Sequence, residues 1–314
     1  MINLDGKFPI PTNETFGQVD STKLQEFMDC PREMFYEHFL GWKLEQENQH
    51  LWFGSCVHVA LEHLSLNGYT DSVIAEAYSL FLEEYRQKFP PETDLLHKAK
   101  TPANVMRALV DYAHEWHTDN FETLYTEVAG SVPISNTRKM LFRIDAICKK
   151  SSGKHFVREY KTGSRLSTAW TNQWTLSVQI GTYLHTINCL YTPEAVEGAM
   201  VDGLFFEQKE NKFSRQWIIK TPDALSSWLY MANSWYEQLE VEVENLKLAS
   251  DSDRVMQAFP MNSRSCTKYG TCPYYAFCCS WANPLQHCAN VPIGMQVSFW
   301  NPENARAPKK VVEL

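Results

Sequence analysis

The stretch Phe156–Gly163, FVREYKTG, decides the fold of this chain. It follows Leu141–Ile147, LFRIDAI, and both stretches have the composition of short apolar strands. Ser151-Ser152-Gly153 between them is a turn signal. The pair therefore predicts a β-hairpin.

Three charged residues lie on this predicted hairpin. Asp145 is on the first strand, and Glu159 and Lys161 lie two residues apart on the second. Residues two apart on a strand project from the same face of a sheet. Two carboxylates and an ammonium on one face can hold divalent cations and stabilise a developing anion. An isolated pattern of this kind is more often a solvated face with a salt bridge, so its meaning depends on the rest of the chain.

Length and composition allow a sizeable core: the chain has 314 residues, of which 44% are hydrophobic and 13% aromatic. No stretch is long and apolar enough to span a membrane, and the N-terminus lacks the pattern of a signal peptide. We therefore expect a cytoplasmic protein.

The formal net charge is −8, yet residues 138–165 contain nine basic residues and only two acids. A basic field around a carboxylate pair suits a polyanionic substrate. The alternative, that the bases cover the solvent side of the hairpin, stays open.

The pattern along the chain predicts helices and strands in alternation. Asp20, Ser21 and Thr22 offer N-caps, with Thr22 and Gln25 as a capping box. Cys30-Pro31 interrupts the first helix, and a second piece ends at Gly41. Further helices are predicted from about 54 and at 71–89, 102–120, 170–190 and 221–248, and strands at 124–134, 140–148, 155–160, 198–207 and 213–220. We expect an N-terminal arm at 1–20, a single domain at 21–288 and a surface tail at 289–314.

The nine cysteines fall into two groups. Cys56, Cys148 and Cys189 stand in apolar settings and are predicted to be buried core thiols. The others, apart from Cys30, crowd the C-terminal region: Cys266, Cys272, Cys278, Cys279 and Cys288. In a long chain without a secretory signal, this crowding favours a metal or cluster site over disulfides.

The order of the motifs resembles that of the PD-(D/E)XK nuclease superfamily. The motifs are Cys30-Pro31-Arg32, Gly54-x-x-x-His58, Asp145, Glu159-x-Lys161, Gln179-x-x-x-Tyr183 and the C-terminal cysteines. Within the superfamily the chain is similar to the iron–sulfur subset of RecB-type nuclease domains, which includes AddB-type helicase–nuclease subunits and CRISPR-adaptation nucleases. The resemblance covers about residues 21–279. It implies an α/β fold with a restriction-endonuclease-like core, a central mixed sheet of about five strands flanked by helices.

The resemblance also implies roles for individual residues. His58, Asp145, Glu159 and the carbonyl of Tyr160 would hold Mg²⁺ or Mn²⁺, and the imidazole favours Mn²⁺. Lys161 would orient or activate water and stabilise the charge that develops on the phosphate. Residues expected to contact DNA are Gln179, Tyr183 and Arg165; Glu62 would have a supporting role, and Glu127 is a weaker candidate.

The cysteines are expected to carry a [4Fe–4S] cluster that staples the N-terminal helices to the C-terminal loop. The ligands implied are Cys30, Cys266, Cys272 and Cys278. The first gap is x5 where the family has x2, so Cys279 or Cys288 could replace one ligand. Zinc is the alternative metal, because thiolates bind it as well.

The function expected is metal-dependent DNA hydrolysis, by an exonuclease of replication, recombination or repair. An endonuclease or flap nuclease with the same site is one alternative. A non-catalytic DNA-binding or assembly module and a zinc-stabilised interaction protein are others. Proteins of replication or recombination are expected partners, and a compact stand-alone nuclease would suit a phage or mobile element.

Overall fold

The computed structural model describes residues 13, 15–268, 270–301 and 309–314. Most of the predicted N-terminal arm lies outside the described residues. The chain divides into two compact units. The sheet unit comprises residues 47–130, 142–225 and 308–314; the cysteine unit comprises residues 1–46, 131–141 and 226–307. The prediction of a single domain at 21–288 stays a prediction.

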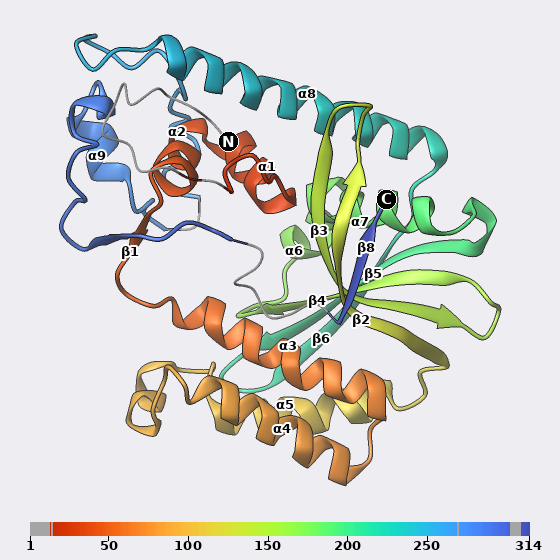
Figure 1. The fold of residues 1–314 in the computed structure, drawn as a ribbon. Coiled ribbons are helices and arrows are strands. Elements are labelled where there is room, and N and C mark those ends of the chain that lie inside the picture. Colours follow the sequence, from red (N-terminus) through yellow and green to blue (C-terminus); the bar gives the residue numbers. More distant parts are fainter. Residues whose placement is uncertain (1–12, 14, 269, 302–308) are drawn as a thin grey trace. The chain divides into compact units, whose positions relative to one another are not determined.

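A six-stranded mixed sheet forms the centre of the fold, in the order β6-β5-β4-β3-β2-β8 (Figure 1). Strand β4 pairs antiparallel with β3 and parallel with β5. This confirms the predicted α/β class with a central mixed sheet. The strands are β2 (Phe121–Pro133), β3 (Lys139–Lys150), β4 (His155–Gly163), β5 (Val196–Phe206), β6 (Asn211–Ile218) and β8 (Lys310–Glu313).

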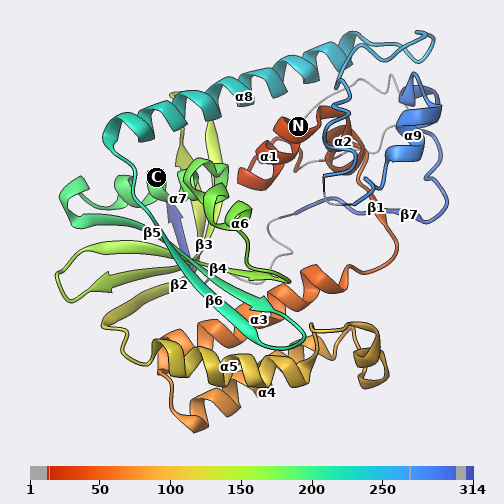
Figure 2. The same ribbon diagram turned by 180° about the vertical axis from the view of Figure 1, so that it is seen from behind.

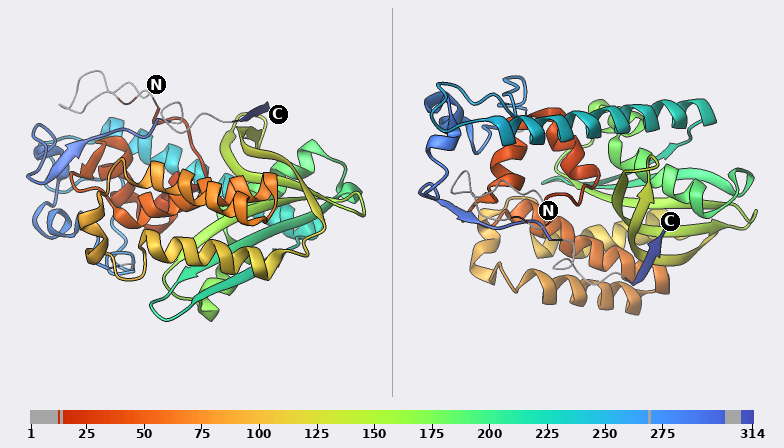
Figure 3. Two further views of the ribbon diagram at one scale, coloured as in Figure 1. Left: turned by 90° about the horizontal axis from the view of Figure 1, so that it is seen from below. Right: turned by 45° about the horizontal axis from the view of Figure 1, so that its top comes forward.

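The sixth strand, β8, comes from the stretch predicted as a surface tail, and Figure 3 shows it beside β2. Gly130 on β2 permits this approach, since a Cβ there would lie 1.7 Å from the carbonyl oxygen of Val312. A four-residue strand carries too little sequence pattern to be told from a tail.

Three helices of the sheet unit lie on one side of the sheet and α7 on the other (Figures 1 and 2). The first three are α3 (Gln49–Asn67), α4 (Asp71–Tyr85) and α5 (Pro102–Trp116), with the short η2 (Pro91–Leu96) between the last two. The predicted helix 170–190 is broken into α6 (Thr168–Asn172), η3 (Gln173–Leu176) and α7 (Val178–Leu190). Ser177 ends η3 and caps α7 by accepting from Ile180 N. The turn η4 (Pro193–Ala195) leads into β5.

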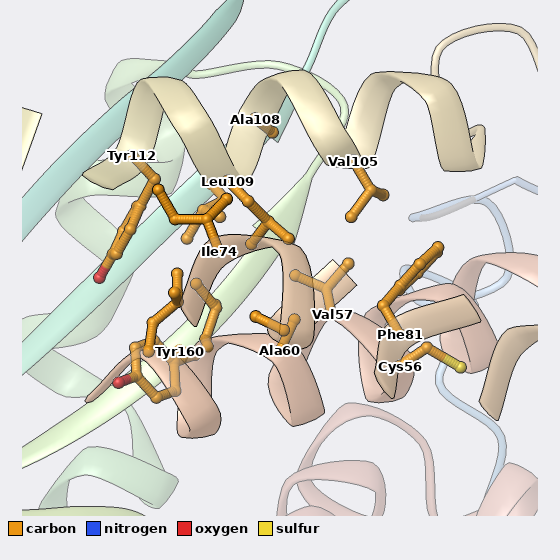
Figure 4. Close-up of a cluster of buried hydrophobic side chains, with 14 of the residues drawn as sticks. Cys56, Val57, Ala60, Ile74, Phe81, Val105, Ala108, Leu109, Tyr112 and Tyr160 are labelled. Atoms are coloured by element: carbon orange, nitrogen blue, oxygen red, sulfur yellow. The ribbon is translucent and has the colours of Figure 1, made fainter. Parts of the chain in front are cut away.

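The main core of the sheet unit lies between α3–α5 and the sheet. Figure 4 shows Tyr160 of β4 beside Val57 and Ala60 of α3 and Leu109 of α5, all fully or almost fully buried. Burying one such large side chain stabilises the fold by about 1.5–3 kcal/mol. Because side chains alternate along a strand, the neighbours Glu159 and Lys161 project to the opposite face from Tyr160. The core thus fixes which residues of β4 face α7.

The cysteine unit contains the other helices and a two-stranded sheet. Asp20, one of the predicted caps, begins α1 by accepting from Lys23 N at 2.8 Å. The break at Cys30-Pro31 is confirmed, because α1 ends at Asp29 and α2 begins at Pro31. The elements of the cysteine unit are α1 (Ser21–Asp29), α2 (Pro31–Met34), the π-helix η1 (Phe35–Phe39), β1 (Trp42–Leu44), β7 (Met295–Val297), α9 (Tyr275–Ser280), η5 (Pro284–Gln286) and α8 (Pro222–Leu248) from residue 226 on. Strands β1 and β7 pair antiparallel.

The prediction of buried core thiols is wrong for one of the three cysteines. Cys56 and Cys148 are buried as predicted, but Cys189 is exposed. It lies in the last turn of α7, where the helix face turned from the sheet meets solvent. None of the described helices is long and apolar enough to cross a membrane.

Candidate active site

Asp145 is held where the ladder between β3 and β4 ends. The paired register runs from Lys149–His155 to Ala146–Arg158 and stops there. The next backbone donor on β4, the Tyr160 N–H, is bound instead by Asp145 Oδ2 at 2.7 Å. The side chain thus replaces a backbone acceptor, and its position is fixed by the hairpin itself.

His58 reaches this carboxylate from α3. Its Nδ1 lies 3.5 Å from Asp145 Oδ2, and its ring meets the Tyr160 ring edge-on at 5.9 Å. Burial lowers the pKa of His58, but the charge and hydrogen bond of Asp145 outweigh burial and raise it overall. Burial raises the pKa of Asp145, and the charge and hydrogen bond of His58 outweigh it, so that this pKa is lowered. The pair therefore favours an ionised carboxylate.

A glycine lets α3 come this close to the sheet. A Cβ at Gly54 would lie 3.1 Å from Thr162 Oγ1 on β4, which is tighter than an ordinary van der Waals contact. The missing side chain thus permits close packing of α3 on β4. His58 follows one helical turn later on the same helix face.

Glu159 is buried, and only one of its two carboxylate oxygens accepts a hydrogen bond from the described residues. Its side chain is only 2% exposed, and Oε1 accepts from Lys161 Nζ at 2.7 Å. Oε2 is buried and has no hydrogen-bond partner in the described part of the chain. Burial, and after it the charge of Asp145, raise the pKa of Glu159 to about 8. An unpartnered buried carboxylate oxygen is costly unless something else binds it.

Lys161 is oriented by a chain of hydrogen bonds from α7. Its Nζ donates to Gln179 Oε1 at 2.8 Å, Gln179 Nε2 donates to Tyr183 Oη at 3.0 Å, and Tyr183 donates to the Arg143 carbonyl. Burial lowers the pKa of Lys161, but the charge and hydrogen bond of Glu159 and the charge of Asp145 outweigh it and raise the pKa overall. The ammonium is therefore fixed and stays charged at neutral pH.

This arrangement gives Tyr183 a different position from the one expected. The sequence suggested that Gln179 and Tyr183 contact DNA, but Tyr183 is only 3% exposed. Its hydroxyl is directed to the backbone of β3. In this geometry the two residues position Lys161.

His58, Asp145 and Glu159 form a donor set that fits a hard divalent cation. Carboxylate oxygens suit Mg²⁺ and Mn²⁺, and one imidazole is compatible with Mn²⁺. The free Glu159 Oε2 is the oxygen that such an ion would engage. The ligand atoms of these three residues do not lie within 4.8 Å of one another in the described structure.

The other acidic candidates are bound to bases. Glu62, which is buried, pairs with Lys309 at 2.7 Å, and Glu127 pairs with Arg143 at 2.6 Å. Glu127 also has a left-handed backbone with a φ of 49°, which is uncommon for a residue other than glycine. Arg165 is exposed two residues beyond the end of β4.

The basic stretch 138–165 is less of an open positive field than the sequence suggested. Five of its nine bases pair with acids: Arg138, Arg143, Lys150, Arg158 and Lys161. Arg158 is only 1% exposed and lies 2.7 Å from the buried Asp202, which also accepts from Tyr112. Sequence reasoning missed this network, because its members come from β4, β5 and α5 and no short-range pattern joins them.

A second constellation lies in the cysteine unit, at the break between α1 and α2. Cys30, 7% exposed, accepts from Asn262 N at 3.4 Å. Cys272 Sγ contacts Glu33 at 3.8 Å. Burial raises the pKa of Cys278 to about 11, and nearby Cys30 and Cys266 add to the rise. The structure thus brings Cys30 together with the three C-terminal cysteines predicted to act with it.

The two cysteines that could replace a predicted cluster ligand, Cys279 and Cys288, lie in different settings. Cys288 is buried and donates to the Pro284 carbonyl at 3.2 Å, whereas Cys279 is exposed. The described residues hold one further group with metal-ligand spacing, which sequence reasoning did not single out: Glu26, Glu37 and His38. Its members are already engaged, Glu26 with His38 and Glu37 with Lys43.

Comparison with known proteins decides the family. The profile of the PD-(D/E)XK nuclease superfamily matches residues 21–279, most of the chain. The chain belongs to the PD-(D/E)XK nuclease superfamily. Membership supports a metal-dependent nuclease-type enzyme, and it agrees with the mixed sheet that carries Asp145 and Glu159-x-Lys161.

Comparisons at the level of whole chains add little to this membership. A solved structure described as "Crystal structure of SSO0001" is similar at 15% identity and a TM-score of 0.32, covering 74% of this chain and 81% of that one. No curated protein matches the sequence significantly.

Proposed function

We propose that this superfamily member is a DNA exonuclease of replication, recombination or repair. Its site would consist of His58, Asp145, Glu159 and Lys161, with the Tyr160 carbonyl as a further metal ligand. The observation that carries the proposal is the buried, unpartnered Oε2 of Glu159 beside Asp145 and a fixed Lys161 ammonium. Action from strand ends rests on the resemblance to RecB-type nuclease domains.

The protein's own groups have defined tasks in such a reaction. A bound Mg²⁺ or Mn²⁺ ion would supply an activated water and neutralise charge on the phosphate. Asp145 is kept ionised by His58 and fixed by the Tyr160 N–H, so it offers a preformed ligand oxygen. Lys161 is held by Glu159 and Gln179 at one position, from which its ammonium stabilises the charge that develops on the phosphate.

The cysteine unit is proposed to carry a [4Fe–4S] cluster on Cys30, Cys266, Cys272 and Cys278. Four thiolates bound to one zinc at about 2.3 Å would have sulfurs about 3.8 Å apart. Among the described residues no three cysteine sulfurs lie within 4.8 Å of one another. The preference for a cluster over zinc rests on the resemblance, which runs through Cys30-Pro31-Arg32 and Cys272-Pro273-Tyr274 alike. Cys288 is the weaker substitute ligand, since it already donates to Pro284.

Digestion of end-labelled single- and double-stranded DNA tests the proposed activity. The wild-type protein is expected to release short labelled products in Mg²⁺ or Mn²⁺ and none in EDTA. Glu159→Gln, which is nearly isosteric, should abolish release with both metals. Lys154→Gln, at an exposed turn lysine, is the matched control and should behave as wild type.

Product sizes separate the activities. Label released first as short oligonucleotides or mononucleotides means attack from the end. Internal fragments without early short products would show an endonuclease or flap nuclease with the same site. Wild-type protein that binds DNA but never cleaves it would contradict the proposal and favour a DNA-binding or assembly module.

A further inference from the structure

The sheet unit contains a large cavity that the catalytic residues do not line. Its volume is about 880 Å³. It is formed by the beginning of α3, the segment between η2 and α5, the end of β4 and the tip of the β5–β6 hairpin. These segments lie near one another in both Figure 1 and Figure 2. A cavity of this size admits a nucleotide-sized group.

Lys100 is the unusual residue of this cavity. Its side chain is only 8% exposed, yet its ammonium has no carboxylate or hydrogen-bond acceptor in the described part of the chain. The nearest recorded contact of Nζ is with the ring of Phe53, at 5.8 Å. Burial lowers the pKa of Lys100, with no nearby charge to oppose the effect. Lys100 therefore buries its aliphatic stem and presents its ammonium to the cavity, where an anionic ligand would neutralise its charge.

The remaining charges of the cavity favour an anionic ligand. Arg165, Lys98 and Lys209 line it, are exposed and have no acidic partner among the described residues. The two acids of the lining, Glu207 and Glu210, lie 3.2 and 3.7 Å from Lys212. His97 adds a buried Nε2 without a partner in the described structure.

The cavity lies along the line from the active site to the start of α3. His50, which lines it, precedes His58 by eight residues on the same helix. At 1.5 Å per residue the two are about 12 Å apart along the helix. This separation is short enough for one DNA strand to reach both places with a few nucleotides.

We propose that this cavity binds a phosphate group of the DNA strand, through Lys100 and Arg165, a few nucleotides from the scissile phosphate. This inference rests on the proposed nuclease function and specifies how the substrate strand is held. The same phosphate chemistry is present in a free nucleotide, which the cavity would hold as released product. Both sources are compared in the test below.

Fluorescence anisotropy of a labelled twelve-nucleotide single strand, measured without divalent metal, tests the cavity. Lys100→Met keeps the length of the side chain and removes its charge. It should weaken strand binding about tenfold, the size of one hydrogen bond to a charged group. The slope of affinity against salt should fall by about 0.7, the loss of one phosphate contact. Lys100→Arg should retain most of the affinity, and Lys154→Met should retain all of it.

A second readout separates binding from a structural role of Lys100. Because Met keeps the buried stem and removes only the head group in the cavity, the thermal melting temperature of Lys100→Met should stay close to that of wild type. A lower melting temperature with unchanged strand affinity would overturn the proposal. Competition with unlabelled deoxynucleoside monophosphate distinguishes the two sources of phosphate. If the monophosphate displaces the strand from wild type but not from Lys100→Met, the cavity also binds the free nucleotide. If it displaces the strand from neither protein, the cavity binds the strand alone.

Hydrolysis of bis(p-nitrophenyl) phosphate measures the nuclease active site separately from strand binding in the cavity. This small diester cannot reach from the active site to the cavity, so Lys100→Met should hydrolyse it at the wild-type rate in Mn²⁺. No hydrolysis by wild type would contradict the nuclease proposal and leave the binding result interpretable. Equal strand affinity of wild type and Lys100→Met would contradict the cavity proposal alone.

Discussion

Glu159 is a buried carboxylate beside a second carboxylate, that of Asp145. Its Oε2 has no hydrogen-bond partner among the described residues. Asp202 also has a buried oxygen, Oδ1, without a partner among the described residues, but its Oδ2 accepts from the guanidinium groups of Arg158 and Arg215 and from the Tyr112 hydroxyl. Glu159 has one partner, Lys161, on one oxygen. Two guanidinium groups balance the charge of Asp202, whereas Glu159 lies beside the Asp145 carboxylate with a single ammonium partner, which supports its proposed role as a metal ligand.

The raised pKa of Glu159 predicts how stability depends on pH. Burial and the Asp145 charge raise the folded-state pKa to about 8, above the ordinary value of 4.5. Between these values the folded state binds more protons than the unfolded state, so the free energy of unfolding falls as pH rises from about 4.5 to about 8. Glu159→Gln should flatten this decline in urea titrations of metal-free protein. A decline of equal size in both proteins would show that Glu159 is not its source.

Gln179 and Tyr183 are expected to act through Lys161. Tyr183→Phe removes the hydroxyl that links Gln179 to β3, and Gln179→Leu removes the acceptor of Lys161 Nζ. Each should lower the rate of DNA hydrolysis by about tenfold or more, since Lys161 loses its fixed position. Manganese affinity, measured by calorimetry, should change little. A loss of DNA affinity with an unchanged rate at saturating DNA would support the direct DNA contact that the sequence first suggested.

At the scale of elements, the contact between α3 and β4 sets the distance between His58 and Asp145. Gly54→Ala gains helix propensity worth up to about 1 kcal/mol, but its new methyl group meets Thr162 Oγ1. The substitution should therefore be nearly neutral or destabilising in wild type. In a Thr162→Ala background the same change should stabilise the protein in urea unfolding. Equal effects in the two backgrounds would show that the glycine is not required by this contact.

Elements that depend on local patterns were predictable from the sequence. Strands β3 and β4, with Asp145, Glu159 and Lys161 on them, follow from apolar runs around a turn signal. The break between α1 and α2 follows from Cys30-Pro31. These signals involve residues close in sequence, so no tertiary information is needed to find them.

Features that depend on distant residues were not predictable. Arg158 looked like a surface base on the hairpin, but it is paired with Asp202, 44 residues later, and buried under α5. The strand β8 joins the sheet through a glycine on β2, and only the folded chain brings the two together. The cavity at Lys100 likewise combines four segments that share no sequence pattern.

At the scale of the whole molecule, each of the two units contains one of the two proposed sites. The catalytic residues all belong to the sheet unit, and the four proposed cluster ligands all belong to the cysteine unit. A cluster that joins Cys30 to residues 266–278 would close a long loop that includes most of the sheet unit, and it would stabilise the fold by restricting the unfolded chain. The role we propose for it is structural.

Cys30→Ser is expected to lose the cluster and lower the thermal stability. Protein purified without oxygen should be brown and contain iron and sulfide, whereas the variant should be colourless. Cys189→Ser, at an exposed cysteine of the sheet unit, is the control and should keep full iron content. Stoichiometric zinc in colourless wild-type protein would contradict the cluster. Full iron content in Cys30→Ser would move the N-terminal ligand to another cysteine.

The metal-dependent rate of DNA hydrolysis by Lys161→Met, compared with wild type, tests the central claim most directly. The ammonium of Lys161 is held by Glu159 and Gln179 beside Asp145, and Met keeps the length of the side chain while it removes the charge. The account predicts a wild-type rate that rises with Mn²⁺ and vanishes in EDTA. The variant should be slower by at least about 100-fold at every metal concentration, with an unchanged circular dichroism spectrum. A variant rate within a few-fold of wild type, or a wild-type rate that persists in EDTA, would contradict it.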